Sequence, residues 1–275
     1  MKNQNYIDLL KFTLTDFHRM EDVEHKPLIN LSNSFASYFF NLFNNKILKP
    51  FNLELMKRFN TSKEHRMNGL DWPASAETMI GLKRLENIEK CICDIVREKV
   101  DGDFIETGVW RGGAVIFMKA LLNEYNLNDR KVFVADSFEG IPKPDVTKYI
   151  EDKGDRHYQW KELSIGELVV RENFRKYNLL DENVIFLKGW FKDTLKTAPI
   201  QKLALMRLDG DMYESTMDAL VPLYPKLEVD GYVIIDDYNG IPACKAAVTD
   251  YRQRNDITDE IMEIDTVSVY WKKTN

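Results

Sequence analysis

Two short apolar runs, each followed at once by aspartates, constrain this chain more than any other feature. Residues 203–208 run into Asp209-Gly210-Asp211, and residues 232–235 run into Asp236-Asp237. A helix-length segment separates the two runs, so the pattern predicts a parallel strand–helix–strand unit. Both strands of such a unit end at the same edge of the sheet, which brings the two acidic clusters together.

These aspartates are interpreted as a site for a divalent metal ion. Carboxylates held this close repel one another unless they share a cation or a proton. Open parallel sheets also bind their ligands at this edge. The alternative is that an aspartate at a strand end caps the following helix. Capping accounts for Asp209 or Asp211 alone, and accounts less well for Asp236 and Asp237 beside them.

A glycine-rich turn indicates a second ligand. The sequence DFIETGVWRGG predicts a strand that ends at Glu106, a turn with Gly108, Gly112 and Gly113, and then a helix. A strand, turn and helix of this kind are the usual cradle for a nucleotide-like cofactor. The dinucleotide fingerprint has a second close glycine where this chain has Trp110. That disfavours a dinucleotide and leaves room for a cofactor without phosphate.

The following two predicted strands add to this cofactor site. Residues 131–135 end at Asp136, and an acidic residue at the end of the second strand typically holds a ribose hydroxyl. Residues 184–187 are followed by Trp190 and Phe191. This aromatic pair could wall an adenine ring, or could belong to the core.

Residues 138–163 are charged, contain Pro142 and Pro144, and show no clear periodicity. Such a polar insertion over the carboxyl edge is typical of a lid. His157 lies within it and could assist catalysis, although a lone histidine in a loop is commonly a solvated surface residue. The next segment, residues 164–177, predicts a helix with Ser164 at its N-cap.

The first 65 residues are predicted to form a helical extension that provides lid or oligomer contacts. The catalytic domain is predicted to follow over residues 66–275. Apolar residues recur there at helical spacing. They are Ile7, Leu10, Leu14 and Phe17, and then Phe35, Tyr38, Phe39 and Leu42. The aromatic second group favours self-association, so we expect a homo-oligomer, either a dimer or a tetramer.

Composition excludes several classes of partner. The net charge is −6 and no run of Lys and Arg dominates any segment, which argues against nucleic acid. No apolar stretch is long enough to span a membrane. The three cysteines form no CxxC pair, which predicts a reducing compartment. The N-terminus lacks the apolar region of a signal peptide. We therefore expect a cytoplasmic protein without a membrane partner.

Five parallel strands followed by a hairpin, predicted over residues 260–264 and 267–271, form the layout of class I S-adenosylmethionine methyltransferases. The motifs resemble those of one branch, the macrocin O-methyltransferase family, and span residues 71–271. They are DWPASAETMIGLKRLENI (71–88), DFIETGVWRGGA (103–114), VADSFEGIPKPD (134–145), FLKGWFKDTL (186–195), MRLDGDMYEST (206–216), VIIDDYNGIPACKAAVTDYR (233–252) and VYW (269–271). The resemblance implies a Rossmann-like α/β fold. Its mostly parallel seven-stranded sheet would carry helices on both faces and a C-terminal antiparallel hairpin.

The resemblance also implies an activity, the Mg²⁺-dependent transfer of a methyl group from S-adenosylmethionine to a hydroxyl group. The acceptor would be a small molecule, namely a sugar, polyketide or peptide natural product of antibiotic biosynthesis. Asp209, Asp236 and Asp237 would bind the metal, and Asp211 would be the general base. The cofactor would be held by Thr78, Met79, Glu106, Gly108, Gly112, Asp136, Ser137, Trp190 and Phe191.

Three other functions compete with this one. A metal-dependent glycosyltransferase would use Asp209-Gly210-Asp211 to bind a nucleotide diphosphate, but would leave Glu106 and Asp236-Asp237 without a role. An NAD-dependent oxidoreductase is disfavoured by Trp110. A non-catalytic binding protein with the same fold would not need all four rim aspartates, which are present.

Overall fold

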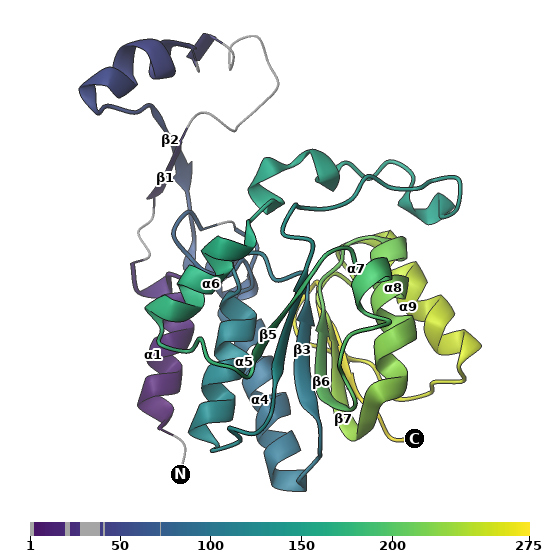
Figure 1. The fold of residues 1–275 in the computed structure, drawn as a ribbon. Helices are drawn as coiled ribbons and strands as arrows, with labels where there is room; N and C mark the ends of the chain where they lie inside the picture. The colour runs from purple at the N-terminus through teal and green to yellow at the C-terminus, as the bar shows by residue number, and fades with distance from the viewer. Residues whose placement is uncertain (1–2, 20–22, 28–38, 41, 72) are drawn as a thin grey trace.

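A seven-stranded sheet with strand order β5-β4-β3-β6-β7-β9-β8 forms the centre of the molecule (Figure 1). The structure is a computed structural model and describes residues 3–19, 23–27, 39–40, 42–71 and 73–275. Neighbouring strands from β5 to β7 pair in parallel, whereas β9 pairs antiparallel with both β7 and β8. This arrangement confirms the predicted Rossmann-like α/β fold and its C-terminal hairpin.

The strands are near-continuous apolar runs because helices cover both faces of the sheet. They are β3 (Asp103–Thr107), β4 (Val132–Asp136), β5 (Val184–Lys188), β6 (Leu203–Leu208), β7 (Leu227–Ile235), β8 (Met262–Glu263) and β9 (Val269–Lys272). Side chains alternate between the faces, so Phe104 packs into one core cluster and Ile105 into the other. β7 begins earlier than predicted, because Leu227 pairs with Leu203 before a register shift.

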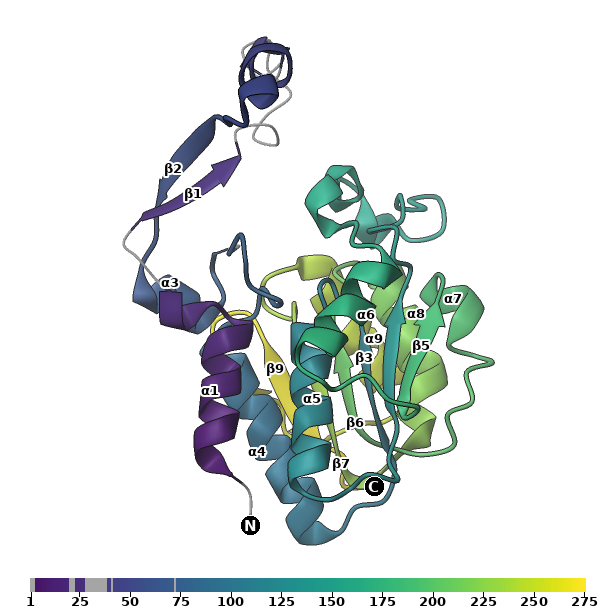
Figure 2. The same cartoon turned by 60° about the vertical axis from the view of Figure 1, so that its left-hand side comes forward.

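Two layers of helices enclose the sheet (Figure 2). One layer contains α1 (Gln4–Leu14), α4 (Leu82–Glu98), α5 (Gly113–Glu124) and α6 (Glu167–Lys176). The other contains α7 (Phe191–Thr194), α8 (Tyr213–Leu223) and α9 (Pro242–Arg254). Among the described residues, no helix is both long and apolar enough to cross a membrane. The N-cap of α6 is Gly166, not the predicted Ser164.

The N-terminal extension is only partly helical. The structure shows α1 as predicted, with Ile7, Leu10 and Leu14 buried in the same core cluster as α4 and α5. It also shows an unpredicted antiparallel hairpin, β1 (Val23–Pro27) with β2 (Met56–Asn60), followed by α3 (Lys63–Asn68). The hairpin projects away from the sheet (Figures 1 and 2). Of the second predicted helix, residues 35 and 38 lie outside the described residues, and Phe39 and Leu42 are exposed.

The segment predicted as a lid, residues 138–163, lies over the carboxyl edge of the sheet (Figure 1). Three short 3₁₀ turns give it shape: Ile150–Asp152, His157–Gln159 and Lys161–Leu163. The aspartates that follow β6 and β7 lie beneath it. This edge therefore combines the strand ends, the acidic residues and the insertion in one place.

Candidate active site

A cavity of about 390 Å³ opens at the carboxyl edge, between the strand ends and residues 138–163. The structure brings together there all but one of the residues predicted for the site. The lining includes Thr78, Met79, Glu106, Gly108, Asp136, Ser137, His157, Trp190, Phe191, Asp209, Asp211, Asp236 and Asp237. The predicted site residue outside this lining is Gly112.

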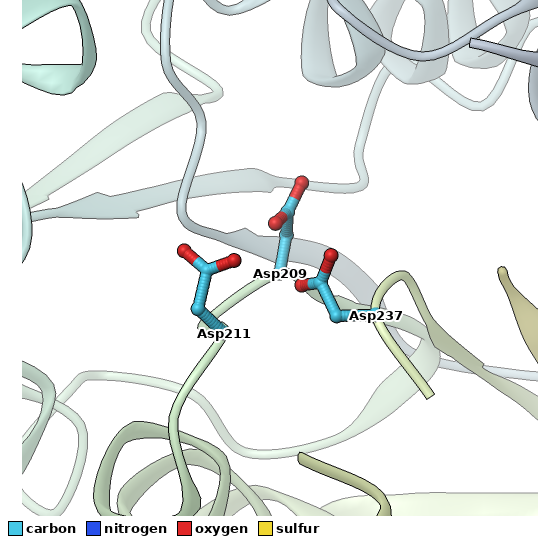
Figure 3. A group of neighbouring side chains, drawn as sticks. All are labelled: Asp209, Asp211 and Asp237. Atoms are coloured by element: carbon cyan, nitrogen blue, oxygen red, sulfur yellow. The ribbon is translucent and has the colours of Figure 1, made fainter. Parts of the chain in front are cut away.

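Three aspartates converge in the cavity (Figure 3). Asp209 follows β6, Asp211 lies two residues further on, and Asp237 follows β7 by two residues. One carboxylate oxygen from each lies within 4.8 Å of the other two. Among the residues the structure describes, Asp237 Oδ2 is buried with no hydrogen-bond partner. Carboxylate oxygens in this arrangement suit a hard divalent cation such as Mg²⁺, so the residues fit the metal predicted from the sequence.

Burial and mutual repulsion perturb all three of these carboxyl groups. Burial raises the pKa of Asp209 to about 6, and the neighbouring Asp236 adds to the shift. Burial, followed by the charge of Asp209, raises the pKa of Asp211 well above its ordinary value. Burial, followed by the charge of Asp211, does the same to the pKa of Asp237. A bound cation would remove the repulsion and favour the ionised form of each group.

Asp236, which was predicted as a metal ligand, lies outside this group. Arg84 Nη1 donates to Asp236 Oδ2 at 2.7 Å, and Arg207 Nη2 donates to the other oxygen, Oδ1. Burial alone would raise the pKa of Asp236, but Arg207 and Arg84 together outweigh it and lower the pKa. Asp236 is therefore part of an internal ion network. The acidic group consists of Asp209, Asp211 and Asp237.

Arg207 is the centre of that network, and it was not among the residues predicted for the site. Its side chain is 1% exposed. Nη1 donates to Glu106 and also to Asp209 Oδ2, the latter at 3.1 Å, so one guanidinium joins the strand ends of β3, β6 and β7. An arginine within the otherwise apolar run LALMRL was the available signal, because a fully buried arginine is almost always paired.

The end of β3 forms the floor of the cavity. Gly108 has a φ of 78°, and a Cβ placed on it would lie 1.7 Å from the backbone oxygen of Asp209. Only glycine allows β3 and β6 to end this close together. Burial raises the pKa of Glu106 to about 8, with Arg207 opposing the shift. Glu106 Oε2 is buried without a hydrogen-bond partner among the described residues, so it is available to a donor on a ligand.

Asp136 and Ser137 form a second cradle at the end of β4. The Asp136 carboxylate accepts the backbone N–H of Val109 at 2.8 Å and that of Phe138 at 2.7 Å. Ser137 Oγ donates to the carbonyl oxygen of Gly140 at 2.7 Å. These contacts hold the Asp136 carboxylate in place where it lines the cavity.

The other predicted cofactor residues come from three further segments. Thr78 is buried and its Oγ1 accepts the backbone N–H of Ile80 at 3.3 Å, in the loop before α4. Trp190 is the N-cap of α7, and Phe191 begins that helix. A Cβ on Gly210 would lie 3.5 Å from the Phe191 ring, so this ring adjoins the acidic turn.

Gly112 and His157 have surroundings that bear on their predicted roles. Gly112 is the N-cap of α5, and a Cβ on it would lie 2.8 Å from Val170, so Gly112 serves the packing of α5 against α6 rather than lining the cavity. His157 lines the cavity, with Nδ1 2.6 Å from Asp155 Oδ2. Its ring packs edge-on against Trp160, with 4.4 Å between centroids.

Comparison with known proteins places this chain in a family. The family model described as macrocin O-methyltransferase (TylF) matches residues 3–273. Demethyldecarbamoylnovobiocin O-methyltransferase of Streptomyces niveus is 55% identical over 213 residues, which cover 77% of this chain and 81% of that protein. Mycinamicin III 3''-O-methyltransferase of Micromonospora griseorubida is 49% identical over 215 residues, which cover 77% of this chain and 84% of that protein.

A solved structure matches the whole fold. The O-methyltransferase NovP has 44% sequence identity and a TM-score of 0.81, over 99% of each chain. The match includes the N-terminal extension as well as the sheet. The family model, the named relatives and the matching fold show that this chain belongs to the macrocin O-methyltransferase family and is an O-methyltransferase.

Proposed function

We propose that this protein transfers the methyl group of S-adenosylmethionine to a hydroxyl group of a sugar or another natural-product acceptor, with Mg²⁺ as a second cofactor. The observation that carries the proposal is the convergence of Asp209, Asp211 and Asp237 in a cavity that also contains the Glu106 and Asp136 cradles. The names of the relatives support the acceptor class, because they describe O-methylation of demethyldecarbamoylnovobiocin and mycinamicin III.

The cofactor has chemically matched partners along the cavity. The buried Oε2 of Glu106 suits the ammonium group of the methionine portion. Asp136 suits the ribose hydroxyls, since its carboxylate is already fixed by two backbone amides. Trp190 and Phe191 provide aromatic surface for the adenine. Thr78 and Met79, from the loop before α4, line the cavity where they would cover the methionine end.

Asp209 and Asp237 would hold the metal ion, and Asp211 would receive the proton. When bound there, Mg²⁺ supplies positive charge that lowers the pKa of a neighbouring acceptor hydroxyl. The hydroxyl oxygen attacks the methyl carbon in line, the carbon–sulfur bond breaks, and S-adenosylhomocysteine leaves. The hydroxyl proton passes to Asp211. Because a sulfonium is already a reactive methyl donor, the protein contributes mainly by positioning the two reactants.

Two substitutions separate these roles. Asp237→Asn removes one charged ligand, so we expect Mg²⁺ affinity to fall by at least about tenfold, as for other disrupted metal sites. Asp211→Asn removes the base, so we expect kcat to fall by about 10²–10⁴-fold. S-adenosylmethionine affinity should stay within about threefold in both, because Glu106 and Asp136 are unchanged. Calorimetry and steady-state kinetics with a glycosylated acceptor measure these quantities.

Asp256→Asn is the matched control. This residue is exposed, lies in the turn after α9 and has a φ of 51°, which asparagine tolerates. It should leave kcat and both affinities unchanged. Full turnover in excess chelator would contradict the metal-dependent mechanism. Mg²⁺ affinity that falls as far in Asp211→Asn as in Asp237→Asn would instead make Asp211 a metal ligand.

A further inference from the structure

α8 begins directly after the acidic turn, and its N-terminus requires a cap. The first amides of any helix have no partner within the helix. The N-cap residue of α8 is Met212, whose thioether is at best a weak acceptor. Serine, threonine, aspartate or asparagine would ordinarily occupy this position. The turn that carries Asp211 therefore runs into a helix that its own sequence does not cap.

The missing cap comes from the segment over the cavity. Asp152, 61 residues from Tyr213 in the chain, accepts the Tyr213 backbone N–H through Oδ1 at 2.6 Å. Its Oδ2 accepts the Glu214 backbone N–H at 3.1 Å. Asp152 is 1% exposed. Its carboxylate also lies at the positive end of the helix dipole, where a negative charge is favourable.

The contact joins two segments at a second point. The rings of Tyr149 and Tyr213 pack with 5.6 Å between centroids. The backbone N–H of Asp152 donates to the carbonyl oxygen of Tyr149, which closes the short turn that presents the carboxylate. The 138–163 segment is therefore attached to the start of α8 through both a hydrogen-bonded cap and an aromatic pair.

The acidic turn depends on where α8 starts. Asp211 has a φ of 59°, a left-handed conformation that is unfavourable for a residue with a side chain. The neighbouring Met212 N–H donates to the Gly210 carbonyl oxygen at 2.6 Å, so the turn is closed immediately before the helix. If the first turn of α8 loosened, the backbone could relax out of this conformation and move the Asp211 carboxylate away from Asp209 and Asp237.

We propose that Asp152 is a positioning residue for the methyl-transfer reaction: by capping α8 from outside the helix, it fixes the Asp209–Asp211 turn in its catalytic geometry. When residues 138–163 dock onto the start of α8, Asp209, Asp211 and Asp237 are then brought together at the same time. This inference rests on the role proposed above for Asp211. It assigns no direct contact between Asp152 and the reactants.

Asp152→Asn and Asp152→Ala test the proposal, with Glu151→Gln as the matched control. The asparagine retains one acceptor oxygen and the alanine retains none, whereas Glu151→Gln removes the same charge from an exposed neighbour. Hydrogen exchange of the Tyr213 and Glu214 amides reports the cap directly. Steady-state kinetics and calorimetry report kcat, the acceptor KM and the S-adenosylmethionine Kd.

We expect faster amide exchange in both Asp152 variants and a kcat reduced by about 10–100-fold in Asp152→Ala, as for residues that orient catalytic ligands. Asp152→Asn should recover part of that loss, and Glu151→Gln should match the unmodified protein. The S-adenosylmethionine Kd should not change. If Asp152→Ala does not fold, Asp152→Asn carries the same comparison.

Where the unmodified protein is active, two results would overturn the proposal. One is unchanged exchange at Tyr213 and Glu214, which would mean that Asp152 does not cap α8 in solution. The other is accelerated exchange with unchanged kcat, or with losses of kcat and cofactor affinity in equal proportion, which would indicate a purely structural role. If the unmodified protein transfers no methyl group, the proposed function fails, and the proposal about Asp152 fails with it even where exchange confirms the cap.

Discussion

Protons would compete with the proposed cation for the carboxylates of Asp209, Asp211 and Asp237. Because burial raises the pKa of Asp209 to about 6, the Asp209 carboxyl is partly protonated in the metal-free protein at pH 6. The pKa values of Asp211 and Asp237 are raised as well. Metal binding must release these protons, so acid opposes it.

We therefore expect Mg²⁺ affinity to increase as the pH rises through about 6. Each proton displaced on binding contributes about a tenfold gain in affinity per pH unit, until the group is ionised without the metal. Calorimetry between about pH 5 and pH 8, in two buffers of different ionisation enthalpy, measures both the affinity and the protons released. Equal affinity at both ends of this range would contradict the pKa shifts.

Asp136→Ala should weaken S-adenosylmethionine binding by about 10–100-fold, because a hydrogen bond to a charged acceptor contributes about 1.5–3 kcal/mol. Asp136→Asn keeps one acceptor oxygen and should lose less. Mg²⁺ affinity serves as the internal control, since the acidic group comes from other strands. Cofactor affinity that is unchanged in Asp136→Ala would remove the ribose assignment.

At the scale of the element, the ends of β3 and β6 approach each other closely at Gly108. Comparing substitutions at Gly108 and at Gly154 separates the cost of this close approach from the cost of backbone strain. Both have positive φ, 78° and 96° respectively. A Cβ on Gly108 would lie 1.7 Å from the Asp209 carbonyl oxygen, whereas a Cβ on Gly154 has nothing described within 4 Å. Substitution at Gly154 therefore measures backbone strain alone, and substitution at Gly108 adds a steric clash.

Gly154→Ala should lower the free energy of unfolding by about 1–2 kcal/mol, the usual cost of a left-handed conformation. Gly108→Ala should lower it by more than about 4 kcal/mol, or prevent soluble expression, because β3 and β6 must separate. Urea denaturation of both variants gives the comparison. Equal losses would show that the strands can separate without cost.

The elements that could be predicted are those with a local cause. Apolar runs that end in an acidic residue or a glycine turn identified β3, β4 and β6 and their place at one edge. Contacts between segments that are distant in the chain have no comparable signal in the local sequence. Asp236 resembles Asp237 in the sequence, yet Arg84 engages it from 152 positions away. Likewise, Asp152 caps α8 from 61 positions away, because the N-cap residue of α8, Met212, makes no side-chain cap.

At the scale of the whole molecule, α1 packs into the core cluster that also contains residues of α4, α5 and the sheet. Leu10 is 4% exposed within the core cluster, whereas the adjacent Leu9 is 62% exposed. Leu10→Ala should lower the free energy of unfolding by about 2–5 kcal/mol. Leu9→Ala should change it by no more than about 0.5 kcal/mol. Denaturant melts of the two variants measure this, and equal effects would mean that α1 is not packed as the structure shows.

The hairpin of the N-terminal extension could not have been predicted from local patterns. The β1 sequence VEHKP and the β2 sequence MKRFN are charged, and neither alternates apolar and polar residues in the manner of a half-buried strand. β2 is mostly exposed, so no buried face imposed that alternation. Periodicity identifies elements that pack against a core, and this pair of strands projects away from one.

The two aspartates that follow β7, Asp236 and Asp237, have different partners, although they are adjacent residues of the same type. Asp236 pairs with the two buried arginines Arg84 and Arg207, whereas Asp237 Oδ2 has no hydrogen-bond partner among the described residues. A folded but inert enzyme, needed to trap methyl donor and acceptor together in a crystal, should therefore be made at position 237. The same change one residue earlier would remove a charge that Arg84 and Arg207 share and leave them with only Asp265, and with Glu106 and Asp209, respectively. It would weaken this buried ion network and should yield less protein instead of a trapped complex.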